Sequence, residues 1–275
     1  MKKRILSAAV LFSLNFSFSS SLELIQNCRS LLSSFSREEM TPFRYAALYG
    51  DKIVFARQKL KEFKPYRSLD EALSSMPVDP SRLFDIQSLS GDGVGFLHLF
   101  SAKIGSPSDN VFIKIPNISN PRSPSFGLGT RNSVDVLNEI NWARYLSSIG
   151  MGPRFYGVYE TPEGRVALVY DFFEGQHFSR SKIFAFRNPR AKERALQTLR
   201  EMREVFSALS VDVHDLQFRI DQAGNVKIID AEFFDIVSSG PTKQLGYQPN
   251  FSLSESLIDT RKVFDLYISK LQKAK

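Results

Sequence analysis

Apolar residues recur at spacings of three and four over the first part of the chain. Ile53, Ala56, Leu60 and Phe63 illustrate the pattern. Such spacing aligns an apolar stripe along one side of a helix. The segment over residues 68–71 reads as a capping box that opens a further short helix, and the prolines over residues 77–80 end it. We therefore predict an N-terminal helical extension over residues 22–80, with a structural role.

Beyond residue 80 the pattern changes to short apolar runs rich in Phe, Val and Ile, separated by Gly and Pro. Runs of this kind predict strands. A helical pattern with Gly150 as its stop signal stands between the third and fourth run, over residues 133–150. The predicted strands cover residues 83–89, 96–102, 111–115, 155–159 and 166–172.

The remaining pattern predicts two helices and one hairpin. An amphipathic helix is expected over residues 188–210 and another over residues 254–273. Between them, residues 218–220 and 226–229 form two short apolar runs joined by a turn that contains Gly224. Strands and helices in this order predict an α+β fold.

Residues 1–21 have a composition of their own. A basic start is followed by an apolar run of about 14 residues and then by a cluster of serines, which is the layout of a secretory signal peptide. The run is shorter than the roughly 20 residues of a transmembrane helix. We expect cleavage after Ser19 or Ser21, export to a periplasmic or extracellular compartment, and no stable membrane anchor afterwards. An amphipathic or buried N-terminal helix is the alternative.

The charge of the chain is modest once this segment is removed. The formal net charge is +7, and Lys2, Lys3 and Arg4 supply three of these charges in a segment without acids, so the remainder carries +4. A net charge this small does not indicate the strongly basic surface that binds nucleic acid, although it suits a phosphorylated ligand. Cys28 is the only cysteine, which excludes an internal disulfide.

Glycines alternate between the first two predicted strands, at Gly91, Gly93 and Gly95. Without Cβ atoms, the backbone N–H groups of such a loop can approach phosphate oxygens closely. A plain tight turn would use the same residues, and this alternative stays open.

Lys114 lies between Ile113 and Ile115 on a predicted strand, so its ammonium group emerges on the opposite face to these neighbours. A buried lysine needs a partner. The following helix offers Glu139 on a face that would look back at the sheet. A Lys and a Glu so placed can hold the α- and β-phosphates of a nucleotide. An exposed Lys and an ordinary helix Glu are the alternative.

Three polar residues flank the predicted hairpin. Asp215 and Gln217 precede its first strand and Asp230 ends its second, so their oxygens converge at one end. Converging carboxylate and amide oxygens suit Mg²⁺. These residues could also be turn caps, but Asp230 follows Ile228 and Ile229, which argues against a solvated surface acid.

The order of glycine loop, strand lysine, helix glutamate, hinge, helix, Asp-Leu-Gln, hairpin and Ile-Ile-Asp resembles the protein-kinase-like superfamily over residues 82–235, a little over half of the chain. The resemblance implies two lobes: an antiparallel N-lobe sheet over residues 81–172 and a reduced helical C-lobe over residues 173–275. It further implies a gatekeeper at Tyr170, a hinge over residues 171–173 whose Asp171 and Phe173 contact adenine, and a metal-binding Asp230.

Two departures narrow the resemblance. His214 directly precedes Asp215, and Ile220 stands where protein kinases place a metal-binding Asn. The shortened Asp-Leu-Gln segment is similar to the catalytic loop of alpha-kinases, which implies that Asp215 orients or deprotonates the acceptor hydroxyl and that Gln217 binds Mg²⁺. Asp230 is followed by Ala and Glu instead of Phe and Gly, which argues against regulation by an activation loop.

Three hypotheses follow. The first is an atypical kinase that binds Mg-ATP and transfers the γ-phosphoryl group to a hydroxyl of a protein or a small molecule. The second is a secreted pseudokinase that binds nucleotide or a protein without turnover. The third is an unrelated α+β protein, for which Lys114 and Asp230 would lie far apart.

Overall fold

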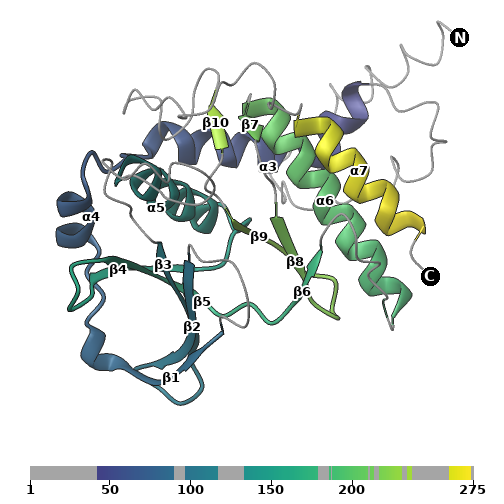
Figure 1. Ribbon diagram of the computed structural model, residues 1–275. Coiled ribbons are helices and arrows are strands. Elements are labelled where there is room, and N and C mark those ends of the chain that lie inside the picture. Colours follow the sequence, from purple (N-terminus) through teal and green to yellow (C-terminus); the bar gives the residue numbers. More distant parts are fainter. Residues whose placement is uncertain are drawn as a thin grey trace, which may run out of the picture. The chain divides into compact units, whose positions relative to one another are not determined.

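The computed structural model describes residues 42–89, 97–116, 133–178, 186, 188–209, 211–213, 217–230, 234–236 and 260–273. The chain forms two compact units, residues 1–51 and 52–275. In the first unit, the described residues 42–51 form the beginning of helix α3 (Pro42–Glu62). The later elements, which are labelled in Figure 1, all belong to the second unit.

A five-stranded antiparallel sheet is the largest sheet among the described residues. Its strands follow the order β1-β2-β3-β5-β4. With five α-helices in the described part of the chain, it confirms the mixed α+β class predicted from the pattern. The strands are β1 (Leu83–Ser88), β2 (Leu97–Ile104), β3 (Asn110–Pro116), β4 (Phe155–Glu160) and β5 (Val166–Asp171).

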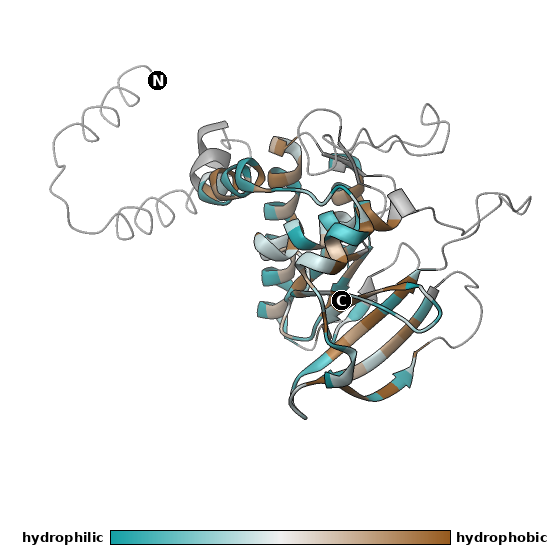
Figure 2. Cartoon of the chain, turned by 90° about the vertical axis from the view of Figure 1, so that its left-hand side faces the viewer, coloured by the Kyte–Doolittle hydropathy of each residue, from teal (hydrophilic) through white to brown (hydrophobic). Residues whose placement is uncertain are grey.

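Alternation along β3 divides its side chains between two cores. Phe112 and Lys114 pair with Tyr170 and Leu168 on β5, and cross-strand partners share a face of the sheet. This face packs against helix α5 (Ser133–Ser148). The opposite face buries an aliphatic cluster that includes Val111, Ile113, Ala167 and Val169. Figure 2 shows apolar and polar residues alternating along the strands of the sheet.

Helix α4 (Leu69–Ser75) leads into the outer edge of the sheet. The Ser68 side chain caps it by accepting a hydrogen bond from the Glu71 N–H at 3.1 Å, as the capping box predicts. Past the helix, the Val78 N–H donates to the Val158 carbonyl and the Val158 N–H donates to the Met76 carbonyl, at 2.8 and 3.0 Å. These bonds occupy backbone groups that an edge strand would otherwise expose.

A smaller three-stranded sheet, β6-β8-β9, follows the large one in the chain. It contains β6 (Gln176–Phe178) and the hairpin of β8 (Gln217–Ile220) and β9 (Val226–Asp230), which the sequence predicted. Gly224 in the hairpin turn has φ +84°, and a Cβ atom there would collide with the Ala191 carbonyl oxygen. The turn therefore requires glycine in order to pack against helix α6.

Helices α6 (Pro189–Leu209) and α7 (Thr260–Lys273) share a core with the hairpin and with α5. The rings of Phe218 on β8 and Phe264 on α7 lie 5.5 Å apart, and Trp142 on α5 is fully buried in the same cluster. Two short strands, β7 (Val211–Val213) and β10 (Phe234–Ile236), pair with each other. The predicted residues 254–259 of the last helix lie outside the described residues.

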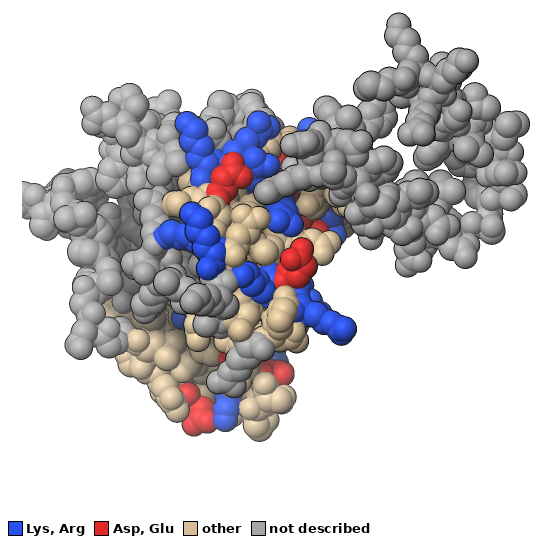
Figure 3. Space-filling view, turned by 90° about the vertical axis from the view of Figure 1, so that its right-hand side faces the viewer, with Lys and Arg blue, Asp and Glu red and all other residues tan. Residues whose placement is uncertain are grey.

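The outer sides of α6 and α7 carry many Lys and Arg side chains and fewer acids (Figure 3). Some of these charges are paired, as where Arg203 on α6 contacts Asp265 on α7 at 2.9 Å. None of the helices in the described residues is long and apolar enough to cross a membrane.

Candidate functional site

A buried ion pair joins the large sheet to helix α5. The Nζ atom of Lys114 lies 2.8 Å from Oε1 of Glu139, and the two side chains are 5% and 1% exposed. Lys114 reaches the helix because alternation along β3 turns it away from Ile113 and Ile115. The pairing predicted from the sequence is therefore confirmed, and the alternative of a solvent-exposed lysine is wrong.

Tyr170 completes this buried contact. Its hydroxyl donates a hydrogen bond of 3.1 Å to Oε1 of Glu139, the same oxygen that faces Lys114. The ring is held between two aromatic neighbours, with centroid distances of 5.1 Å to Phe155 and 6.3 Å to Phe112. One carboxylate oxygen thus meets two donors in a buried environment, where satisfied polar contacts are strong and fix a single geometry.

A cavity of about 300 Å³ opens beside the ion pair. Its volume is at the lower end of the range found for small-molecule sites, about 300–1,000 Å³. The large sheet, the connection after β5 and the β8–β9 hairpin all contribute to its walls. Its lining consists of Leu89, Leu99, Phe112, Lys114, Pro153, Tyr170, Asp171, Phe172, Phe173, Gln217, Arg219 and Ile229.

The predicted hinge contributes three adjacent residues to this cavity: Asp171, Phe172 and Phe173. Two of their N–H groups are used within the protein. The Asp171 N–H donates to the Arg154 carbonyl at 2.8 Å, and the Phe172 N–H donates to the Asn110 carbonyl at 3.0 Å. These bonds tie the connection to the sheet and to the residue before β4.

The hairpin brings a predicted metal ligand to the same cavity. Gln217 lines it, and its backbone is paired with that of Asp230 across β8 and β9, with a bulge after Gln217. Lys114 and the hairpin residue Gln217 therefore line the same cavity.

Several predicted site residues cannot be placed. Asp215 and the three glycines Gly91, Gly93 and Gly95 lie outside the described residues, as does the side chain of Asp230. Among the residues that the structure describes, no group of three or more His, Cys, Asp or Glu side chains could hold a metal ion. The magnesium site therefore stays a prediction that rests on Gln217 and on the position of Asp230 at the end of β9.

Arg219 is a cavity residue that the sequence interpretation missed. On β8 the fully buried Phe218 and Ile220 face the core, which leaves Gln217 and Arg219 on the cavity side. Nη1 of Arg219 donates to the carbonyl of Phe173 in the hinge at 3.4 Å. Burial lowers the pKa of its guanidinium. The alternation that singled out Lys114 would have pointed to this residue as well.

The position of helix α5 is fixed from its outer side by residues 56–66. The fully buried Asn141 accepts a hydrogen bond from the Tyr66 N–H at 2.8 Å and donates one to the Tyr66 carbonyl at 3.0 Å. The guanidinium of Arg144 stacks 3.7 Å from the centroid of the Tyr66 ring. Because Glu139 is on the same helix, these contacts also set where its carboxylate lies.

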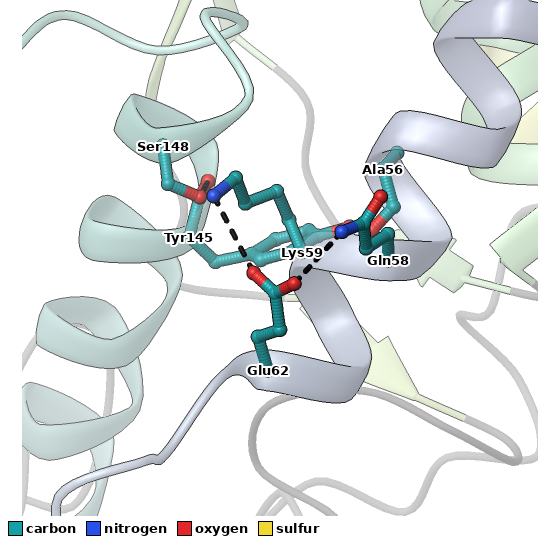
Figure 4. Close-up of polar contacts among 6 residues, drawn as sticks. All are labelled: Ala56, Gln58, Lys59, Glu62, Tyr145 and Ser148. Atoms are coloured by element: carbon teal, nitrogen blue, oxygen red, sulfur yellow. Dashed lines mark hydrogen bonds and ion pairs between the residues drawn. The ribbon is translucent and has the colours of Figure 1, made fainter.

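Tyr145 adds a second attachment between α5 and this segment. Its hydroxyl donates to the Ala56 carbonyl at 2.9 Å (Figure 4). Burial raises the pKa of the phenol. Figure 4 also shows Gln58 and Lys59 contacting Glu62 within α3, at 2.9 and 3.4 Å. A part of the predicted N-terminal extension thus supports the helix that carries Glu139.

No protein-family model matches this chain, and no curated protein is significantly similar to it. The geometry of the cavity and the chemistry of its side chains are therefore the guides to its function.

Proposed function

We propose that residues 52–275 bind a Mg-nucleotide in the cavity, in the manner of the protein-kinase-like superfamily, and transfer its γ-phosphoryl group to a hydroxyl. The observation that carries this proposal is the buried Lys114–Glu139 pair beside a cavity that also contains Gln217. A salt bridge so deeply buried is weak support for stability, because removing two charges from water offsets much of their attraction. A role in ligand binding accounts for it better.

The arrangement of elements supports the same proposal. In protein kinases the nucleotide-binding lysine is on the third strand and pairs with a glutamate of the following helix. Here Lys114 is on β3, and Glu139 is on α5, between β3 and β4. On the side away from β2, β3 pairs with β5, the strand that ends in the predicted hinge.

The chemistry of the walls suggests the direction of the bound nucleotide. The base would lie toward Asp171 and Phe173, and the α- and β-phosphates would lie toward Lys114. Gln217 and Asp230 offer the hard oxygen ligands that Mg²⁺ prefers. When bound, the ion would neutralise charge on the phosphates.

Phosphoryl transfer would proceed in line. Asp215 would accept the proton of the acceptor hydroxyl while the hydroxyl oxygen bonds to the γ-phosphorus. The bond from that phosphorus to the oxygen that bridges it to the β-phosphate would break, which leaves ADP. Lys114, held by Glu139, would stabilise the charge that develops on the leaving diphosphate.

A secreted pseudokinase is the second candidate. The replacement of the Phe and Gly after Asp230 by Ala and Glu, and the shortened loop at Asp215, favour it. It shares the nucleotide cavity with the first candidate and lacks only turnover.

Two measurements test these proposals. A thermal-shift titration with ATP and Mg²⁺ should stabilise the protein, by about 2.7 kcal/mol at a ligand concentration 100 times the dissociation constant. Lys114→Met should abolish the stabilisation, whereas Lys59→Met, at an exposed site, should leave it intact. If the wild-type protein shows no stabilisation, the nucleotide site is wrong.

Turnover is tested separately by a single-turnover assay with γ-labelled ATP. Transfer of label to protein or to a hydroxyl acceptor should be lost in Asp230→Ala and retained in Asp70→Ala, a change in the exposed first turn of α4. Binding without any transfer in the wild-type protein would favour the pseudokinase.

A further inference from the structure

Arg219 places a second cation in the cavity, at some distance along the chain from Lys114 and on a different wall. Its neighbours Phe218 and Ile220 are fully buried, so the β8 backbone holds the Arg219 side chain on the cavity side. This orientation does not depend on a flexible loop. A planar guanidinium is thus presented to the cavity from a strand of a sheet.

The surroundings of Arg219 distinguish it from Lys114. Lys114 is paired with Glu139, whereas within the described residues Arg219 has no acidic partner within ion-pairing distance, and its guanidinium donates a hydrogen bond to the Phe173 carbonyl. The lowered pKa of its guanidinium has burial as its cause, with no neighbouring charge contributing. A half-buried cation without a carboxylate partner is costly unless a ligand compensates it.

The contact with Phe173 fixes which end of the cavity Arg219 occupies. Phe173 is in the predicted hinge, where the proposed function places the base, so Arg219 contacts that end of the cavity. Leu89 and Leu99 line the cavity from the large sheet, whereas Arg219 and Ile229 line it from the hairpin. An apolar wall and a wall with a planar cation can both contact the faces of a flat aromatic ring, since guanidinium groups stack on aromatic rings.

We infer that Arg219 holds the nucleobase of the ligand by stacking its guanidinium on the ring, while Lys114 holds the phosphates. This inference rests on the proposed function and specifies its ligand as one with a flat aromatic base. Stacking on a face does not depend on the hydrogen-bonding edge of the base, so adenine and guanine nucleotides should depend on Arg219 to a similar degree.

Isothermal titration of the full chain with three probes tests this division of labour: adenosine, Mg-ATP and Mg-tripolyphosphate. Arg219→Met keeps the length of the side chain and removes the cation. It should weaken the binding of adenosine and of Mg-ATP by the same factor. We expect about 5- to 30-fold, for a partly desolvated cation–π contact of about 1–2 kcal/mol. Mg-tripolyphosphate should bind unchanged, which also shows that the variant is folded.

Two further variants complete the experiment. Arg219→Lys keeps the charge and loses the plane, so its affinity for adenosine should fall between those of the wild type and Arg219→Met. Arg190→Met, at an exposed position near the start of α6, should change nothing.

The outcomes separate this inference from the proposed function. If Arg219→Met weakens Mg-tripolyphosphate and leaves adenosine unchanged, Arg219 binds phosphate and the inference is wrong, although the nucleotide site stands. If Arg219→Met changes the affinity for neither adenosine nor Mg-tripolyphosphate, the inference is equally wrong. If the wild-type protein binds none of the three, the proposed function itself fails.

Discussion

Glu139 shows at the residue scale how a single carboxylate connects packing to chemistry. One of its oxygens faces the Lys114 ammonium at 2.8 Å and the Tyr170 hydroxyl at 3.1 Å, in a position almost sealed from water. Removal of one member of such a pair leaves an uncompensated charge in the core, which is far more harmful than removal of both members.

Lys114→Met should therefore lower the free energy of unfolding by about 3–5 kcal/mol, because it leaves the Glu139 carboxylate buried without its cation. The double variant Lys114→Met with Glu139→Leu should recover most of this loss. Urea unfolding of the wild type, both single variants and the double variant gives the coupling energy. A single-variant loss below about 1 kcal/mol would show that the pair is more hydrated than its burial indicates.

Gly224 is a second residue where geometry leaves little choice. Gly224→Ala should destabilise the protein by more than Gly164→Ala, its matched control. Both glycines have positive φ, +84° and +73°, which costs an alanine about 1–2 kcal/mol. Only at Gly224 would the new Cβ atom collide with backbone, at the Ala191 carbonyl. Thermal unfolding of the two variants measures the difference, and equal losses would mean that α6 shifts to accommodate the methyl group.

The sequence predicted some of these residues and missed others for physical reasons. Lys114 could be found because a cation between two isoleucines on a strand must point away from them. Arg219 obeys the same alternation, but the shorter hairpin gave a weaker signal. The hydrogen bond from Tyr170 to Glu139 could not be predicted, because it depends on the pairing of β3 with β5 and on the rotation of α5.

At the scale of elements, helix α5 is held between the large sheet and residues 56–66. The inner face of the helix is apolar apart from Glu139, whereas its outer side uses specific polar contacts from Asn141, Arg144 and Tyr145. Apolar packing tolerates small shifts, but the two hydrogen bonds between Asn141 and Tyr66 define one position along the helix axis.

Asn141→Leu should loosen the helix, because it leaves the Tyr66 N–H and carbonyl without their partner in a buried place. We expect a loss of about 1–3 kcal/mol in stability and faster amide exchange along α5, measured by hydrogen–deuterium exchange. Ser148→Ala removes only the hydrogen bond from an exposed residue at the end of the same helix to the Tyr145 carbonyl, and should leave exchange in the rest of α5 unchanged. Equal protection in wild type and Asn141→Leu would mean that the apolar face alone positions Glu139.

Tyr145 gives the same attachment a pH dependence. Burial raises the pKa of the folded phenol above its ordinary value near 10.0, so its contribution is complete below about pH 10. It is lost as the pH rises further, by up to about 1.4 kcal/mol per pH unit, because only the unfolded state releases the proton. Tyr145→Phe should lose about 1 kcal/mol near pH 8 with the hydrogen bond to Ala56. The difference in free energy of unfolding between wild type and Tyr145→Phe, measured by urea unfolding, should narrow above about pH 10. A constant difference would contradict a raised pKa of Tyr145.

The hydrophobic pattern predicted the ends of those elements in which apolar residues repeat with a clear helix or strand period. The five strands of the large sheet and helices α5 and α6 lie within about two residues of their predicted positions, which is ordinary precision for element ends. Strands β6, β7 and β10 have three residues each, too few to show an alternation. Their pairing depends on partners distant in the chain, which a local pattern does not contain.

At the scale of the whole molecule, the mixed α+β class was predictable, because long periodic segments of both kinds are present. The large sheet is antiparallel, as predicted, with the strand order β1-β2-β3-β5-β4. The two-lobed kinase-like architecture and its boundaries at residues 81 and 173 stay predictions. They depend on segments around Asp215 and beyond Asp230 that lie outside the described residues.

Export is a further proposal at this scale, because residues 1–21 have the composition of a signal peptide. Expression of the full chain in a bacterial host should give a mature product in the periplasm or medium that begins at Ser20 or Leu22. N-terminal sequencing of that product checks the cleavage site. Replacement of Lys2, Lys3 and Arg4 by neutral residues should reduce export. If the unsubstituted protein stays uncleaved in the cytoplasm of the host, the proposal is wrong.

The attachment of α5 to residues 56–66 also has a consequence in time. Asn141 is made 75 residues after Tyr66 and Tyr145 is made 89 residues after Ala56, which corresponds to roughly 4 to 18 seconds of synthesis at about 5–20 residues per second. During that interval the early segment has no helix to bind. A nascent chain that cannot complete its core during this interval stays unfolded, which is the state that the proposed export through a translocation channel would require.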